Sequence, residues 1–127
     1  MWDVHLSPFL PWERRGEHRD APGVYAVATG NADNIIYIGL TVQSDGLRGR
    51  LRQFHRSATT GQPGHAGGVT YHQRFGPDVF ALLVAVHFPH AVNTSATVMG
   101  AYVQYAERLL IWRYVARHGE LPACNSA

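Results

Sequence analysis

The 127-residue chain contains no lysine and only one cysteine, and each scarcity limits what the protein can be. A single cysteine, Cys124, cannot form an internal disulfide, so we expect a reducing, cytoplasmic environment. No apolar stretch is long and uncharged enough to span a bilayer. We expect no signal peptide, because the first residues lack a basic stretch followed by an apolar run. Hydrophobic residues make up 46% of the chain, enough for one folded domain rather than a disordered segment.

All eleven basic residues are arginines, and the formal net charge is +2. Four of the arginines lie close together in the sequence: Arg48, Arg50, Arg52 and Arg56. A guanidinium group presents a planar fork that can hold a phosphate with two hydrogen bonds. The cluster is therefore a candidate contact for DNA, and a solvated helix face is the alternative.

The pattern of apolar runs and turn residues predicts one α/β domain of the α+β type over residues 1–127, with an irregular arm at 1–22 packed on it. The expected elements are strands at 23–29, 34–40 and 80–88, helices at 47–58 and 96–119, and a glycine-rich loop at 59–68. We expect a small, mainly antiparallel sheet of three strands flanked by helices, in which the first two strands form a hairpin.

The helix expected at 96–119 is apolar on two faces, which predicts that it is buried nearly all round. Glu107 lies within one of these faces, between Val103 and Leu110, and no arginine stands three or four positions away to pair with it. Burying a lone carboxylate is costly unless a cation compensates its charge, so Glu107 is a candidate metal ligand. A side chain that reaches solvent or a distant arginine is the alternative.

Two tyrosines stand near glycines in the predicted hairpin, in Gly23-Val24-Tyr25 and in Tyr37-Ile38-Gly39. Side chains alternate along a strand, so Tyr25 and Tyr37 share one face only if the numbers of paired residues have an even sum. A shared face would make a common reaction centre possible. Two core aromatics, which strands favour, are the alternative.

These motifs, together with residues further along the chain, resemble the GIY-YIG nuclease family. The residues that carry the resemblance are, in chain order, Gly23-Val24-Tyr25, Tyr37-Ile38-Gly39, Leu47, Arg50, Glu107, Leu121-Pro122 and Asn125. The first motif has valine in place of isoleucine, and the second matches in full. Each short motif is weak alone, but the combination in the right order is fairly specific and extends over most of the chain.

The resemblance implies an endonuclease that hydrolyses DNA with one Mg²⁺ or Mn²⁺ ion bound by Glu107. It implies Tyr25 as the general base, Tyr37 as a partner that orients water or phosphate, and Arg50 as the phosphate clamp. A phenol with a pKa near ~10 is a poor base unless a nearby cation stabilises the phenolate. Asn125 is expected to support the site near the tyrosines, or to be an ordinary residue of the closing segment.

Phe54 stands four residues after Arg50, where several members of the family have a histidine or tyrosine, and His55 follows it. Phenylalanine cannot move a proton, so we expect His55 to transfer a proton or contact phosphate, with a solvent-facing histidine as the alternative. The expected nucleic-acid contacts are Arg48, Arg52, Arg56 and His65. His65 stands in the glycine-rich loop, where an ordinary loop histidine is the alternative.

Three functions are compatible with this sequence. The first is a compact metal-dependent nuclease that acts on DNA, as a monomer, as a homodimer or with a targeting partner protein. The second is a non-catalytic nucleic-acid-binding module with the same fold. The third is a globular protein whose tyrosines are only structural. An unpaired glutamate in an apolar helix face favours the nuclease, because a binding module has no physical reason to keep it.

Overall fold

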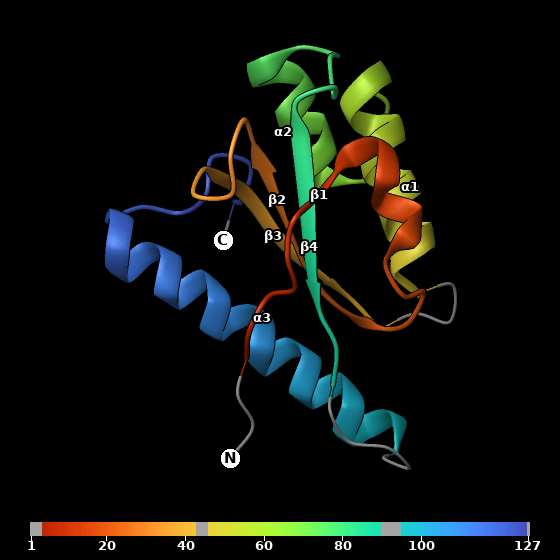
Figure 1. Ribbon diagram of the computed structural model, residues 1–127, viewed down its shortest axis with the longest axis vertical. Coiled ribbons are helices and arrows are strands. Elements are labelled where there is room, and N and C mark those ends of the chain that lie inside the picture. The colour runs from red at the N-terminus through yellow and green to blue at the C-terminus, as the bar shows by residue number, and fades with distance from the viewer. Residues whose placement is uncertain (1–3, 43–45, 90–94, 127) are drawn as a thin grey trace.

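Strands β2 (Gly23–Thr29) and β3 (Ile35–Thr41) form the predicted antiparallel hairpin at the centre of this computed structural model, which describes residues 4–42, 46–89 and 95–126. Strand β4 (Leu82–His87) pairs with the other side of β2, and β1 (Leu10–Pro11) pairs with β4. The sheet therefore has the order β1-β4-β2-β3 and is antiparallel throughout (Figure 1). Three strands were expected. The fourth, β1, has only two residues and lies in the arm predicted to be irregular.

The hairpin register is the one that the shared-face hypothesis requires. Val27 is opposite Tyr37, and Tyr25 is opposite Gly39, so the paired numbers have even sums. The register shifts only between Val27 and Ala28, on the turn side of both tyrosines. Tyr25 and Tyr37 therefore point to the same face of the sheet.

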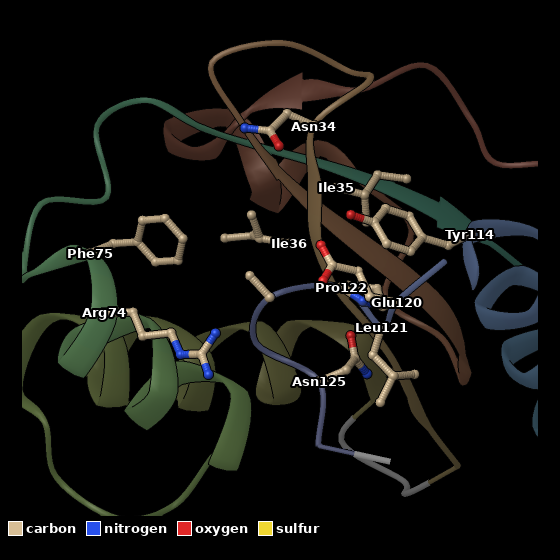
Figure 2. Close-up of a pocket in the computed structure, with 11 residues that line it drawn as sticks. Asn34, Ile35, Ile36, Arg74, Phe75, Tyr114, Glu120, Leu121, Pro122 and Asn125 are labelled. Carbon is tan, nitrogen blue, oxygen red and sulfur yellow. The ribbon is translucent and has the colours of Figure 1, made fainter. Parts of the chain in front are cut away.

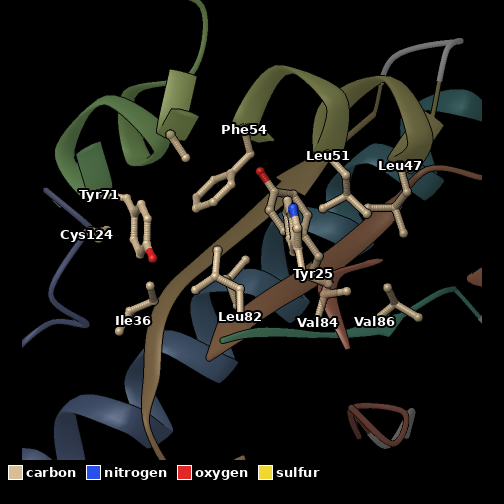
Figure 3. Close-up of a cluster of buried hydrophobic side chains, with 13 residues drawn as sticks. Tyr25, Ile36, Leu47, Leu51, Phe54, Tyr71, Leu82, Val84, Val86 and Cys124 are labelled. Carbon is tan, nitrogen blue, oxygen red and sulfur yellow. The ribbon is translucent and has the colours of Figure 1, made fainter. Parts of the chain in front are cut away.

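Helices α1 (Gly46–Thr60) and α2 (Ala66–Phe75) cover one face of the sheet, and α3 (Ala96–His118) covers the other (Figure 1). The apolar stripe predicted for α1 is confirmed, because Leu47, Leu51 and Phe54 point to the sheet (Figure 3). Tyr25 lies in the same buried cluster. The site described below is therefore built on the α1 and α2 side.

Helix α2 begins inside the segment that the sequence predicted as a glycine-rich loop. A Cβ atom added at Gly67 would lie 2.5 Å from the ring of Tyr37, and one at Gly68 would lie 2.7 Å from the carbonyl oxygen of Phe54. The two glycines therefore allow α2 to approach Tyr37 and α1 closely. The arm also contains a short 3₁₀ helix, η1 (Trp12–Glu17), which lies beside α1 and buries Trp12 (Figure 1).

Helix α3 begins after the N-cap Ser95 and ends at Gly119, whose φ of +79° is left-handed, as the stop signals predicted. The expectation that α3 is buried all round is wrong. Its inner face, with Val103 and Leu110, packs on the sheet, but Tyr105 and Trp112 on the other face are exposed. Within the described ranges, no helix has the length and apolar character needed to cross a membrane.

Candidate active site

The two phenol rings of Tyr25 and Tyr37 lie side by side, with ring centroids 5.9 Å apart. Gly39 makes this arrangement possible. A Cβ atom there would lie 2.6 Å from a ring carbon of Tyr37 and 2.8 Å from the hydroxyl oxygen of Tyr25. Gly23 is equally constrained, because its Cβ would lie 2.7 Å from the carbonyl oxygen of His87. Gly39 is therefore a steric requirement of the hairpin, and Gly23 is one of the pairing between β2 and β4.

His65 is the direct partner of Tyr25, with 2.6 Å between the histidine Nε2 and the tyrosine hydroxyl oxygen. The other ring nitrogen, Nδ1, accepts a hydrogen bond from the backbone N–H of Gly68 at 3.2 Å, as the N-cap of α2. Nδ1 therefore carries no proton. In neutral His65 the proton is on Nε2, and Nε2–H donates to Tyr25.

The placement of His65 corrects the sequence-based expectation. His65 was expected in a flexible loop that touches nucleic acid, but its side chain is only 1% exposed and packs against Tyr37. Burial, with a further contribution from the charge of Arg50, lowers the pKa of His65 to about 3. The imidazole is consequently neutral at neutral pH and acts as a fixed hydrogen-bond donor.

Arg50 projects from α1 toward the same cluster. Its guanidinium donates to Gln53 at 2.6 Å and to the carbonyl oxygen of Gly64 at 3.4 Å. Burial raises the pKa of Tyr25 well above its ordinary value, and the charge of Arg50 opposes this effect without cancelling it. The pKa of Tyr37 is also raised, mainly by burial and against the charge of Arg50. Both phenols are therefore protonated at neutral pH in the protein alone.

Glu107 lies on the inner face of α3, among apolar side chains as predicted. Its side chain is 19% exposed, and burial raises the pKa of its carboxyl group. The neighbouring Arg108, which the helix-spacing argument did not consider, places its Nε 4.0 Å from a carboxylate oxygen. The charge of Glu107 contributes to the raised pKa of Tyr37, after the larger effects of burial and of Arg50.

A divalent cation at this site would have one carboxylate ligand from the protein, that of Glu107. Among the described residues no group of three or more histidine, cysteine or acidic side chains is arranged to hold a metal. Mg²⁺ commonly binds through one or two carboxylates and keeps several of its waters. The half-buried Glu107 carboxylate therefore fits the protein's share of such a site.

Asn125 holds the backbone of β3 between the second tyrosine and its glycine. Its side-chain amide donates to the carbonyl oxygen of Ile38 and accepts from the N–H of Ile38, both at 2.9 Å. Figure 2 shows Asn125 on the C-terminal segment beside β3, at a hollow of about 400 Å³. Asn125 thus binds the strand that carries Tyr37, and its support of a functional site stays a prediction.

His55 lies elsewhere. Its Nδ1 accepts a hydrogen bond from the indole N–H of Trp12 at 2.9 Å, and the two rings are stacked. Burial lowers the pKa of His55. The structure brings Phe54, and not His55, against Tyr37 and His65, with ring centroids 6.0 Å and 5.1 Å away. The proton-transfer role expected for His55 in the tyrosine cluster therefore has no geometric support.

The exposed arginines of α1 contact two different parts of the molecule. A guanidinium nitrogen of Arg48 donates to the carbonyl oxygen of Gly16 in η1, at 3.2 Å. One of Arg56 donates to the carbonyl oxygen of Pro63, beyond the other end of the helix, at 3.4 Å. Arg52 lines a hollow with Arg48. Their contact with DNA stays a prediction.

Segments far apart in the chain thus meet at one cluster. Strands β2 and β3 supply the phenols, α1 supplies Arg50, and the start of α2 supplies His65. Glu107 lies on α3, which covers the other face of the sheet, and is linked to this cluster through its effect on the pKa of Tyr37. Comparisons with protein-family models, with curated proteins and with solved structures give no match for this chain. A function must therefore be inferred from the chemistry of these residues.

Proposed function

We propose that the protein is a divalent-metal-dependent endonuclease of the GIY-YIG type that hydrolyses phosphodiester bonds in DNA. The observation that carries the proposal is the pair of phenols, 5.9 Å apart, with a fixed imidazole donor on Tyr25 and a guanidinium beside them. A purely structural aromatic cluster does not require a cation or a histidine whose tautomer is set by a helix cap.

Each residue has a role in the proposed reaction. Arg50 binds the scissile phosphate and offsets the negative charge that develops on it. Tyr25, as the phenolate, accepts the proton of the attacking water, and Tyr37 orients that water or the phosphate. The water oxygen forms a bond to phosphorus while the bond from phosphorus to the leaving oxygen breaks, and that oxygen takes up a proton from solvent.

Tyr25 must lose its own proton before it can act as a base. Burial opposes this loss, while the Nε2–H of His65 and the charge of Arg50 favour the phenolate. A Mg²⁺ ion held by Glu107 would supply the further positive charge that stabilises the phenolate and neutralises the phosphate. The proposal therefore requires activity that depends on a divalent cation.

The non-catalytic binding module remains the second candidate, because one observation favours it. The pKa of Tyr25 is raised well above its usual value by burial, which keeps the phenol neutral in the protein alone. A neutral phenol donates a hydrogen bond to phosphate but does not activate water. The two candidates therefore differ in whether DNA is cut after it is bound.

Cleavage of supercoiled plasmid DNA with Mg²⁺ or Mn²⁺ separates the candidates. We expect the wild-type protein to nick the plasmid and Tyr25→Phe to lose at least about a hundredfold in rate, the scale of losing a general base. Glu107→Gln should also lose activity, because the proposed ligand of the metal ion is removed. Trp112→Ala, an exposed aromatic on the outer face of α3, is the control and keeps full activity. A wild-type protein that binds DNA but never cuts it with either metal would leave the binding module as the function.

A further inference from the structure

Two adjacent hollows lie between η1, α1 and the segment before β4, away from the tyrosine cluster. One, of about 270 Å³, is lined by Arg15, Arg48 and Arg52. The other, of about 340 Å³, is lined by the aromatic side chains Trp12, His55 and Phe80. Glu13 and Arg15 line both, so the two hollows are neighbours that share one wall.

The first hollow is lined by three guanidinium groups and one carboxylate, that of Glu13. Two of these groups are held in place. Arg15 donates to the carbonyl oxygen of Trp12 at 2.9 Å and lies 4.9 Å above the indole ring, while Arg48 donates to Gly16. Glu13 offsets one of the three positive charges, so the lining keeps a net positive charge that a further anion can balance. Three arginines that are partly fixed in advance are suited to a phosphate group.

The second hollow has an exposed aromatic ring at its wall. The side chain of Phe80 is 85% exposed, although it lies beside the recess that Val79 and Trp12 line. Asp78 accepts a hydrogen bond from the N–H of Phe80 at 2.8 Å, which fixes the backbone of this turn. Because Nδ1 of His55 accepts from Trp12, the proton of neutral His55 is on Nε2. An exposed aromatic ring beside a hydrogen-bond donor is suited to a nucleobase.

We propose that the two hollows together hold one unpaired nucleotide of the substrate, with its phosphate on Arg15, Arg48 and Arg52 and its base on Phe80. The inference rests on the proposed function and names its substrate class: DNA in which a single-stranded segment adjoins a duplex. A base inside a duplex is stacked on both faces and cannot reach Phe80, so the nucleotide must be unpaired.

The position of this nucleotide relative to the tyrosines follows from helix geometry. Arg50 and Arg52 are two residues apart, so their side chains leave α1 in directions about 200° apart. The scissile phosphate at Arg50 and the unpaired nucleotide would therefore flank α1. An α-helix with its side chains is about 10 Å across, so the strand would pass over the outer surface of α1 between the two positions.

The test measures DNA binding in the Glu107→Gln background, without divalent cations, so that cleavage is not needed for the readout. Fluorescence anisotropy gives the affinity for a blunt duplex and for the same duplex with a single-stranded overhang. We expect Phe80→Ala to weaken overhang binding by about fivefold to a hundredfold, the scale of one lost base stack, and to leave blunt-duplex binding unchanged. Trp112→Ala, also a large exposed aromatic, is the matched control and changes neither affinity.

The phosphate half of the proposal is tested by the salt dependence of overhang binding. Replacing Arg52 by glutamine should reduce the slope of log affinity against log salt by about 0.7, the value for one single-strand phosphate contact. Arg117→Gln removes the same charge from α3 and should leave the slope unchanged. An equal loss on blunt and overhang DNA in Phe80→Ala, or no loss on either, would overturn the proposal.

The failure of this inference can be distinguished from the failure of the nuclease proposal. If the protein prefers overhang DNA through Phe80 but never cuts DNA, the nucleotide-site proposal stands and the nuclease proposal fails. If the protein cuts plasmid DNA but its binding to overhang DNA does not depend on Phe80 or Arg52, the nuclease proposal stands and the nucleotide-site proposal fails. Thermal melting of Phe80→Ala and Arg52→Gln confirms that both variants are folded.

Discussion

The protein should lose stability in acid through one residue, His65, because burial holds its imidazole neutral. The pKa of His65 is lowered from 6.5 to about 3 in the folded protein. As the pH falls below about 6.5, the unfolded chain takes up a proton at this position and the folded protein does not, so folding becomes less favourable. The stabilisation is complete above this range and is lost progressively as the pH falls toward 3.

The two pKa values give the size of the effect. Each pH unit in which only the unfolded chain is protonated costs about 1.4 kcal/mol. Between about pH 7 and about pH 4.5, His65 alone should therefore reduce the free energy of unfolding by about 2.5 kcal/mol. That is a substantial share of the roughly 5–15 kcal/mol that stabilises a typical domain.

Urea unfolding of the wild type and of His65→Gln at both pH values measures this contribution. Glutamine does not titrate in this range, so the variant lacks the acid-dependent loss, even if it is less stable at neutral pH. The drop between the two pH values should be about 2.5 kcal/mol larger in the wild type than in the variant. Equal drops would show that His65 is protonated in the folded protein or is exposed there, and the tautomer argument would fail.

Three further predictions concern the residues around the tyrosine pair. Gly39→Ala should destabilise the fold by about 1–3 kcal/mol through overpacking, because its Cβ meets both tyrosine rings. The control, Gly100→Ala in α3, meets no such neighbour and should stabilise the fold by about 0.5–1 kcal/mol. Urea unfolding measures the free energy of unfolding of both variants. Asn125→Ala should leave the N–H of Ile38 unpaired, cost about 1–3 kcal/mol and accelerate hydrogen exchange at that amide. Tyr25→Phe should give nearly the same phenolate absorbance as the wild type at a pH of about 10, where an ordinary phenol is half ionised, because burial raises the pKa of Tyr25 well above that value. An absorbance lower by about half of one phenolate would show that Tyr25 titrates normally.

The hairpin and α3 could be predicted because their signals are local. Apolar strand-forming runs flank the polar turn in the hairpin, and Gly119 marks the end of α3. For the register, the sequence supplied only the condition under which Tyr25 and Tyr37 share a face, and the structure meets that condition. The position of Glu107 on an apolar face followed from helical periodicity alone.

The features that the sequence did not predict depend on contacts between distant segments. Two glycines near the start of α2 each cost about 1 kcal/mol in helix propensity, so the local signal indicates a loop. They are needed only because α2 approaches Tyr37 and Phe54 too closely for a Cβ atom at either position. The contact between Tyr25 and His65 joins residues 40 positions apart, and no rule of sequence spacing predicts it. The exposure of Trp112 likewise depends on which face of α3 the sheet covers.

The C-terminal segment also has a consequence for how the protein behaves at high concentration. Strand β3 is the edge of the sheet, and an edge with free N–H and C=O groups is a template on which another chain can add a strand. Asn125 occupies both backbone groups of Ile38, and the N–H of Cys124 occupies the carbonyl oxygen of Ile36. The last residues therefore act as an internal blocker of strand addition. Removing them should turn the strand that carries Tyr37 into a site of self-association.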